Sequence, residues 1–302
     1  MKPFAHTCAV LGLITATLLI GTGGAAEPLA FEPVPGFFKL PDTIKLGACS
    51  GVAVNSQGDI YLFHRGEHPI IQLDRSGSFV RAWGDDMIHT AHGLRIDGDD
   101  NVWVTDIGNH QVLKFSSAGK LLLTLGKAGQ AGLGTDEFNK PTDVAFGPRA
   151  EIYVSDGYGN SRVIKFTPNG GFLTTWGEPG DGPGQFNLPH TIVVDRQGRV
   201  VVGDRENDRA QVFDENGKLI EIWNGFAPFG LAHDKQGQLF VADGRAHKVL
   251  QLDNKGKIVA SWGQEGAAPG QFQLPHMLAA DGEGNLYVGE ITSQRFQKLA
   301  RQ

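Results

Sequence analysis

The chain has 302 residues, of which 40% are hydrophobic and 20% charged, and this suits one large globular domain or two of ordinary size. Its formal net charge of −6 at pH 7 offers no basic surface, which argues against a nucleic-acid-binding function. The 42 glycines show no collagen-like period and indicate many tight turns.

The first 26 residues have the layout of a secretory signal peptide. Lys2 precedes an apolar run at 8–20, and small residues follow it up to Ala26, the expected cleavage site. The run is shorter than the roughly 20 apolar residues that a membrane-spanning helix needs. We therefore expect a leader at 1–26, a mature domain at 27–302, and export to the periplasm or the extracellular space.

From residue 49 onwards the sequence repeats six times in one register. Each unit contains successive short apolar runs with period-two alternation and turn residues between them, which predicts antiparallel strands. Four strands in 40–50 residues are typical of one propeller blade. The units begin at residues 49, 91, 141, 189, 228 and 275. The sequence thus predicts an all-β, six-bladed β-propeller that forms a single domain.

The sixth unit ends before its fourth strand. Its last apolar run lies within "RFQKLARQ" at the C-terminus. We expect the segment 28–40 to supply the missing strand, because a ring left open would expose unpaired strand edges.

The second residue of each unit, here called the anchor, is expected on the innermost strand, where it lines the central channel. The anchors are Ser50, His92, Thr142, His190, Phe229 and His276. Histidines thus occupy alternate blades, about 120° apart in a ring of six. A lone channel histidine is usually a hydrogen-bonded core residue, but three converging imidazoles with an open fourth position match a catalytic zinc site. The pattern therefore predicts a metal site, with zinc favoured by the imidazole ligands.

A second ring of polar residues follows each anchor by fourteen positions. Its members are His64, Asp106, Asp156, Asp204, Asp243 and Glu290. Short acids at strand ends usually bind the backbone of turns, so we expect a structural role for these.

Three side chains close to this second ring suggest chemistry. Arg65 and Arg205 could hold a carboxylate through two hydrogen bonds each. Tyr158 beside such cations could serve as a base. An anionic small molecule or peptide is the expected substrate.

Several stretches resemble the peptidyl-α-hydroxyglycine α-amidating lyases, which are six-bladed propellers of NHL repeats. They include "LFHRGEH" (62–68), "YVSDGYGNSRVIKFTPNG" (153–170), "DRENDRAQVF" (204–213) and "PHMLAADGEGNLYVG" (275–289). The resemblance runs from about residue 50 to the C-terminus. It implies a lyase that cleaves the carbon–nitrogen bond of a peptidyl-α-hydroxyglycine, or a related carbinolamide, to give an amide and glyoxylate.

The resemblance also assigns roles to individual residues. It implies zinc ligands at His92, His190 and His276, and catalytic residues at Tyr158, Arg65 and Arg205. It further implies a substrate carboxylate and a separate monooxygenase that makes the hydroxyglycine. We expect the protein to act as a monomer.

A structural calcium ion is a further property of the resembling family. Val52 and Leu94 match its backbone-carbonyl ligands, whereas Met277 stands at the position of its carboxylate ligand. A thioether cannot replace a carboxylate around a hard cation, so calcium binding is in doubt.

Two other functions remain open at this stage. One is a different metal-dependent propeller enzyme, such as a lactonase, although those sites favour carboxylate ligands and calcium over an all-histidine ring. The other is a non-catalytic NHL-repeat scaffold that binds a protein or glycan. The fold alone does not decide among these functions.

Overall fold

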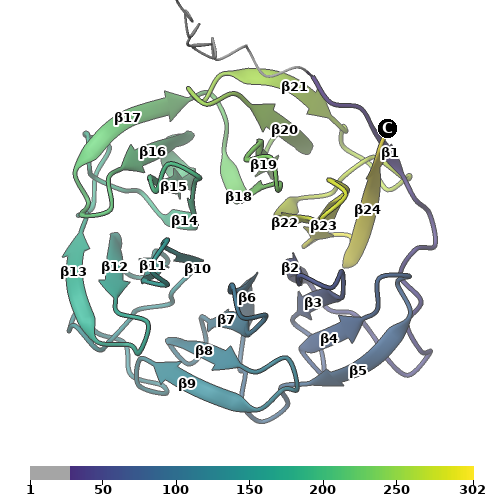
Figure 1. Cartoon of the computed structure of the whole chain (residues 1–302), viewed down its shortest axis with the longest axis horizontal. Helices are drawn as coiled ribbons and strands as arrows, with labels where there is room; N and C mark the ends of the chain where they lie inside the picture. Colours follow the sequence, from purple (N-terminus) through teal and green to yellow (C-terminus); the bar gives the residue numbers. More distant parts are fainter. Residues whose placement is uncertain (1–27) are drawn as a thin grey trace, which may run out of the picture.

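A computed structural model describes residues 28–302, and the expected leader lies outside the described residues. Six four-stranded antiparallel sheets are arranged around a central channel (Figure 1). The all-β, six-bladed propeller predicted from the repeats is therefore confirmed. In the described part of the chain, no helix is long and apolar enough to span a membrane.

In the first three blades the chain runs outwards from the channel, one strand after another. Blade 1 consists of β2 (Cys49–Val54), β3 (Ile60–His64), β4 (Ile70–Leu73) and β5 (Phe79–Trp83). Blade 2 consists of β6 (Ala91–Ile96), β7 (Val102–Asp106), β8 (Gln111–Phe115) and β9 (Leu121–Leu125). Blade 3 consists of β10 (Asp143–Phe146), β11 (Ile152–Asp156), β12 (Arg162–Phe166) and β13 (Phe172–Trp176).

Blades 4 and 5 repeat this order, and blade 6 departs from it only in its outermost strand. Blade 4 consists of β14 (Pro189–Val194), β15 (Val200–Asp204), β16 (Arg209–Phe213) and β17 (Leu219–Asn224), with a short 3₁₀ helix η1 (Arg205–Asn207) after β15. Blade 5 consists of β18 (Pro228–His233), β19 (Leu239–Asp243), β20 (Lys248–Leu252) and β21 (Ile258–Trp262). Blade 6 consists of β22 (Pro275–Ala280), β23 (Leu286–Glu290), β24 (Arg295–Arg301) and β1 (Phe31–Pro33).

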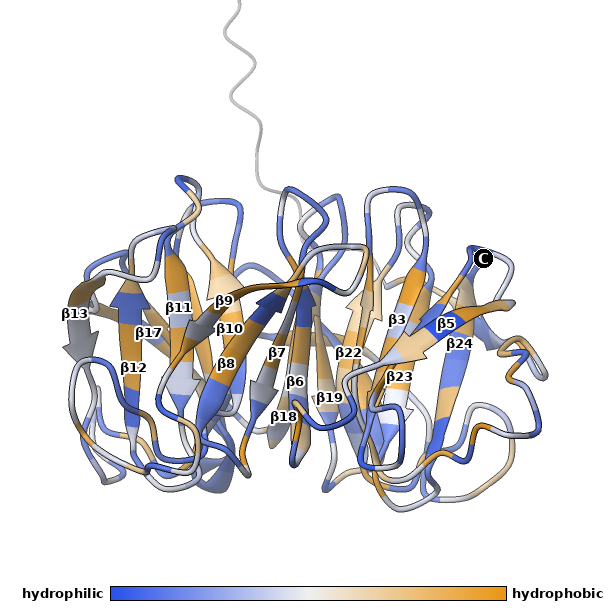
Figure 2. Ribbon diagram, turned by 90° about the horizontal axis from the view of Figure 1, so that it is seen from below, coloured by the Kyte–Doolittle hydropathy of each residue, from blue (hydrophilic) through white to orange (hydrophobic). Residues whose placement is uncertain are grey.

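The core lies between neighbouring blades. Both faces of the second strand of each blade are buried, as in β3 and β7, because adjacent blades cover them. The outermost strands are half exposed, as in β9 and β13. Figure 2 shows the consequence, with hydrophobic stretches within the strands of the wall and many hydrophilic residues in the loops on the two faces. Apolar burial therefore holds the blades together and fixes the residues that face the channel.

The ring closes through the strand that the sequence analysis expected near the N-terminus. In the segment 28–40 only β1 forms a strand, and it pairs antiparallel with β24 from Phe31↔Arg301 to Pro33↔Leu299. The Phe31 ring packs edge-on against Trp262, with centroids 4.9 Å apart. The predicted closure is thus confirmed, with the first described residues completing the last blade.

We expect this closing strand to be essential for stability. A chain that begins at Pro41 loses β1 and should melt at least ~10 °C below one that begins at Pro28, because the edge of β24 and its apolar neighbours become exposed. Phe31→Ala should cost about 2 kcal/mol, since the ring is partly buried. Circular dichroism melting curves of the three proteins measure both effects. Equal melting temperatures for the two chain lengths would contradict closure by β1.

Candidate active site

Three histidines converge on the axis of the channel. His92, His190 and His276 lie near the starts of β6, β14 and β22, and all three are buried. Their ring centroids are 4.7, 4.8 and 4.8 Å apart, which makes an almost equilateral triangle. Their potential ligand nitrogens all lie within 4.8 Å of one another. The register of the repeats therefore brings these alternate anchors into one cluster that could hold a metal ion.

The other three anchors orient the histidines. Each imidazole Nδ1 lies within hydrogen-bonding distance of the backbone carbonyl of the anchor on the next blade. The pairs are His92 with Thr142 (2.6 Å), His190 with Phe229 (2.7 Å) and His276 with Ser50 (2.7 Å). A carbonyl can only accept, so Nδ1 carries the proton and Nε2 keeps its lone pair. Ser50, Thr142 and Phe229 were not recognised as functional from sequence, although their alternation with the histidines was a usable signal.

The Nε2 lone pairs of the three histidines form a site that favours a bound cation. The Nε2 atoms of His92 and His190 are 3.1 Å apart, and neither carries a proton in this tautomer. Two such lone pairs repel each other unless a positive charge lies between them. Imidazole nitrogens fixed by carbonyl acceptors are a recurring arrangement in metal sites. The donor set fits zinc, with three protein ligands and a fourth position left for another group.

The histidines are also neutral at pH 7, as metal ligands must be. Burial lowers the pKa of His92 and His190 far below the usual imidazole range, and the neighbouring histidines and arginines add to the effect. Burial lowers the pKa of His276 to about 3. Protons therefore compete only weakly for these nitrogens at neutral pH.

Calcium fits the channel poorly. Val52 and Leu94, whose carbonyls match the calcium ligands of the resembling family, are buried on β2 and β6. Met277, also buried, offers a thioether where that family has a carboxylate. Calcium requires several oxygen ligands, usually including carboxylates, and we derive no step through it.

Tyr158 lies beside the histidine cluster. It follows β11, and its hydroxyl oxygen is 3.2 Å from the Nε2 atoms of both His92 and His190. The phenol ring stands edge-on to both imidazoles. A group bound at the open position of the metal would therefore lie within reach of the Tyr158 hydroxyl.

Arg205 is held against Tyr158 by three contacts. Its Nη1 is 3.4 Å from the Tyr158 hydroxyl, and its Nε donates to Glu206 at 2.8 Å. The guanidinium also lies over the Phe229 ring, 4.7 Å from its centroid. Glu206 and Phe229 thus fix the orientation of this cation, a role that sequence reasoning missed. The available signals were that Glu206 directly follows Arg205 in the sequence and that Phe229 is itself one of the six anchors.

Arg65 is a second cation on this side of the cluster. Its Nε donates to the carbonyl of Ala91, the residue before His92, at 3.0 Å. Its charge contributes to the lowered pKa of His92 and of His276. The Arg65 side chain is otherwise exposed. The structure therefore brings the three histidines, Tyr158 and Arg205 into contact around one centre, and it tethers Arg65 to the backbone beside His92.

The ring of acids has the structural geometry expected of it. Asp204 is buried and accepts hydrogen bonds from the Asn187 N–H at 2.7 Å and from Arg209 at 2.7 Å. Asp106, Asp156, Asp243 and Glu290 likewise accept from the backbone that precedes their own blade. These acids tie the loop before each blade to its second strand.

In blade 1 a histidine replaces the acid of this ring. His64 is fully buried, and its Nδ1 accepts from the N–H groups of Gly47 and Gly66. Burial lowers the pKa of His64 to about 4, so the ring is neutral at pH 7. The histidine therefore supplies the acceptor that a carboxylate supplies in the other blades.

Comparisons with known proteins agree with this architecture. A model of the NHL repeat matches residues 89–115, 138–166 and 186–213. The protein named peptidyl-alpha-hydroxyglycine alpha-amidating lyase 1 of Drosophila melanogaster is 30% identical over 85% of this chain and 58% of its own length. The peptidyl-glycine alpha-amidating monooxygenase of Mus musculus is 37% identical over 61% of this chain and 22% of its own length.

The chain thus spans about a fifth of the mouse relative and over half of the fly relative. A solved structure of streptogramin B lyase superposes with a TM-score of 0.65 at 16% identity, over 91% of this chain and 98% of that one. This last likeness supports the fold.

His64 should make the protein sensitive to acid. Its folded-state pKa of about 4 lies below the value of 6.5 for an unperturbed histidine, so its contribution to stability is complete above pH 6.5 and is lost as the pH falls towards 4. His64→Asn keeps an acceptor without this titration. The variant should therefore lose less stability than the wild type between pH 6.5 and 4, by on the order of 2–3 kcal/mol. Urea unfolding at several pH values measures the difference, and parallel profiles would contradict a buried neutral His64.

Proposed function

We propose that this chain, which contains NHL repeats and is homologous to the fly and mouse proteins named above, is a zinc-dependent carbon–nitrogen lyase. Its substrate would be a peptidyl-α-hydroxyglycine or a related carbinolamide, cleaved to an amide and glyoxylate. The observation that carries the proposal is the pairing of a neutral histidine triad with a phenol whose oxygen lies 3.2 Å from the Nε2 atoms of two of the histidines. A non-catalytic scaffold has no need of that arrangement.

The two arginines suit the carboxylate of such a substrate. Arg205 is oriented by Glu206 and Phe229, and Arg65 is tethered to the backbone next to His92. A guanidinium binds a carboxylate through two parallel hydrogen bonds, which fixes both the position and the angle of the bound group. The α-carbon next to that carboxylate would then lie near the metal and Tyr158.

Zinc held by His92, His190 and His276 would supply Lewis-acid stabilisation of negative charge on the substrate hydroxyl oxygen. Tyr158, in its phenolate form, would accept the hydroxyl proton. The electron pair of the broken O–H bond forms the aldehyde C=O, and the bond from the α-carbon to the amide nitrogen breaks. The nitrogen takes up a proton, so that the products are a primary amide and glyoxylate and no water is consumed.

We further propose that the protein acts after export, and that a separate monooxygenase supplies the hydroxyglycine. Both proposals rest on the sequence, through the leader-like first 26 residues and the resemblance to the amidating lyases.

Metal content and activity should be lost together when a ligand is removed. The purified protein should hold about one zinc per chain and release glyoxylate from α-hydroxyhippurate. His190→Ala should lose both, whereas His233→Ala, a substitution of an exposed histidine, should lose neither. Metal analysis beside a glyoxylate assay gives the result. A protein that holds zinc but releases no glyoxylate would overturn the proposed lyase activity and leave the proposed metal site standing.

Tyr158→Phe should separate chemistry from metal binding. Loss of the phenolic oxygen removes the proton acceptor, and kcat should fall by about 10²–10⁴-fold. The zinc content should stay at the wild-type level, because the three histidines keep their carbonyl partners. Loss of zinc in this variant would assign Tyr158 a role in the metal site in place of proton transfer.

Arg205→Lys tests carboxylate recognition. A lysine keeps the charge but not the paired geometry, so KM should rise about tenfold or more with a smaller change in kcat. Arg149→Lys, which alters an arginine whose side chain is 67% exposed, is the matched control and should behave as the wild type. An unchanged KM in Arg205→Lys would place the substrate carboxylate elsewhere.

A further inference from the structure

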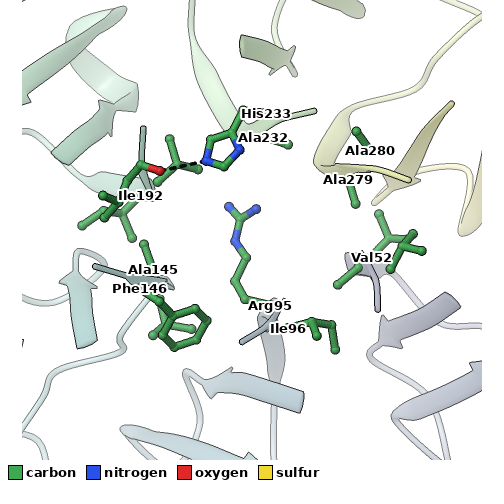
Figure 3. A pocket seen from close by; sticks show the side chains of 15 residues that line it. Val52, Arg95, Ile96, Ala145, Phe146, Ile192, Ala232, His233, Ala279 and Ala280 are labelled. Carbon is green, nitrogen blue, oxygen red and sulfur yellow. Dashed lines mark hydrogen bonds between the residues drawn. The ribbon is translucent and has the colours of Figure 1, made fainter. Parts of the chain in front are cut away.

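The channel contains a buried ion pair that the proposed chemistry does not use. Arg95, three residues after His92 on β6, reaches into the channel (Figure 3). Its Nε and Nη2 donate to the two carboxylate oxygens of Asp143 on β10, at 3.0 and 2.5 Å. The Asp143 side chain is fully buried, and that of Arg95 is 15% exposed.

Asp143 has no capacity left for another ligand. Its Oδ1 also accepts from the Val144 N–H at 2.9 Å, and its Oδ2 also accepts from Thr191 Oγ1 at 2.9 Å and the Ile192 N–H at 3.1 Å. The five hydrogen bonds saturate both oxygens. A metal ion could bind this carboxylate only by displacing the guanidinium.

The network spans four consecutive blades. Arg95 of blade 2 binds Asp143 of blade 3, and its Nη2 also donates to Thr191 of blade 4 at 3.2 Å. The Thr191 hydroxyl accepts in turn from the Leu231 N–H of blade 5 at 3.1 Å. One guanidinium therefore joins, directly or through one hydroxyl, the inner strands of more than half the ring.

The register of the repeats shows which blades place a charged residue next to the anchors, around the Arg95–Asp143 ion pair. The residues one position after the anchors are Gly51, Gly93, Asp143, Thr191, Gly230 and Met277. The carboxylate among these six residues is Asp143, in blade 3. Blade 6 lies opposite blade 3, and the resembling family has its calcium-binding acid in blade 6. Met277 supplies no charge there, and the charge of Asp143 is neutralised by Arg95.

We propose that the Arg95 guanidinium is a built-in cation that braces the channel in place of a bound calcium ion, so that the fold is independent of calcium. A covalently attached cation is always present, whereas a bound ion depends on its concentration. The proposal concerns stability and does not rest on the lyase reaction.

The first test titrates calcium. The protein is stripped of metals, reloaded with one equivalent of zinc, and melted in 0 to about 5 mM CaCl₂, a range that covers weak extracellular sites. After zinc is restored, calcium is varied by addition alone and no chelator is present, because a chelator would also remove the zinc. We expect no change in Tm and no binding heat in calorimetry. Stoichiometric calcium binding with a rise in Tm would overturn the proposal, whatever the variants do.

The second test removes the cation. Arg95→Ala leaves the Asp143 charge buried and unpaired and should lower Tm by roughly 6–15 °C. Arg149→Ala, which removes an exposed guanidinium and leaves Glu151 paired with Lys165, is the matched control and should change Tm little. A loss in Arg95→Ala no larger than in Arg149→Ala would overturn the bracing role.

The third test exchanges the two cations. The double variant Arg95→Ala/Met277→Asp frees Asp143 and adds a carboxylate on the opposite blade, so calcium should now raise its Tm by several degrees. A double variant that melts independently of calcium would overturn the idea that the guanidinium takes the place of an ion. All three tests read stability, so their outcome is separate from that of the glyoxylate assay.

Discussion

The hydrogen bonds from three channel histidines to the carbonyls of the intervening anchors link the site to the propeller itself. Each bond crosses from one blade to the next and fixes an imidazole tautomer at the same time. The orientation of the ligands is therefore set by the packing of the blades. In other metal sites side-chain carboxylates or water molecules can orient the ligands. Here the backbone of the innermost strands does this work, so the geometry depends on correct closure of the whole ring.

Closure itself depends on residues distant in sequence. β1 completes the blade that contains His276, and His276 donates to Ser50 of blade 1. The junction between blade 6 and blade 1 thus carries both the end of the ring and one side of the histidine triangle. A propeller that failed to close would lose one of the three bonds that hold the triangle.

Charge is divided along the channel. Arg205 beside Tyr158 and Arg65 beside the backbone of His92 keep donors free for an anion, whereas Arg95 is neutralised by Asp143. Arginine thus serves substrate recognition beside the histidine cluster, whereas at Arg95 it holds neighbouring blades together. The difference arises from the carboxylate partner: Glu206 binds only the Nε of Arg205, whereas Asp143 binds Arg95 through both of its oxygens.

The sequence by itself determined the number of blades, the closing segment and the histidine triangle. These follow from a repeat, because a fixed register around one axis converts the positions of His92, His190 and His276 into angles. Only the tertiary structure decided which side chains from different blades meet. The packing of Phe229 against Arg205 and the pairing of Arg95 with Asp143 join residues at unequal positions of different repeats, which the register does not pair. Such contacts depend on side-chain direction and on the packing of neighbouring blades, which the one-dimensional pattern does not specify.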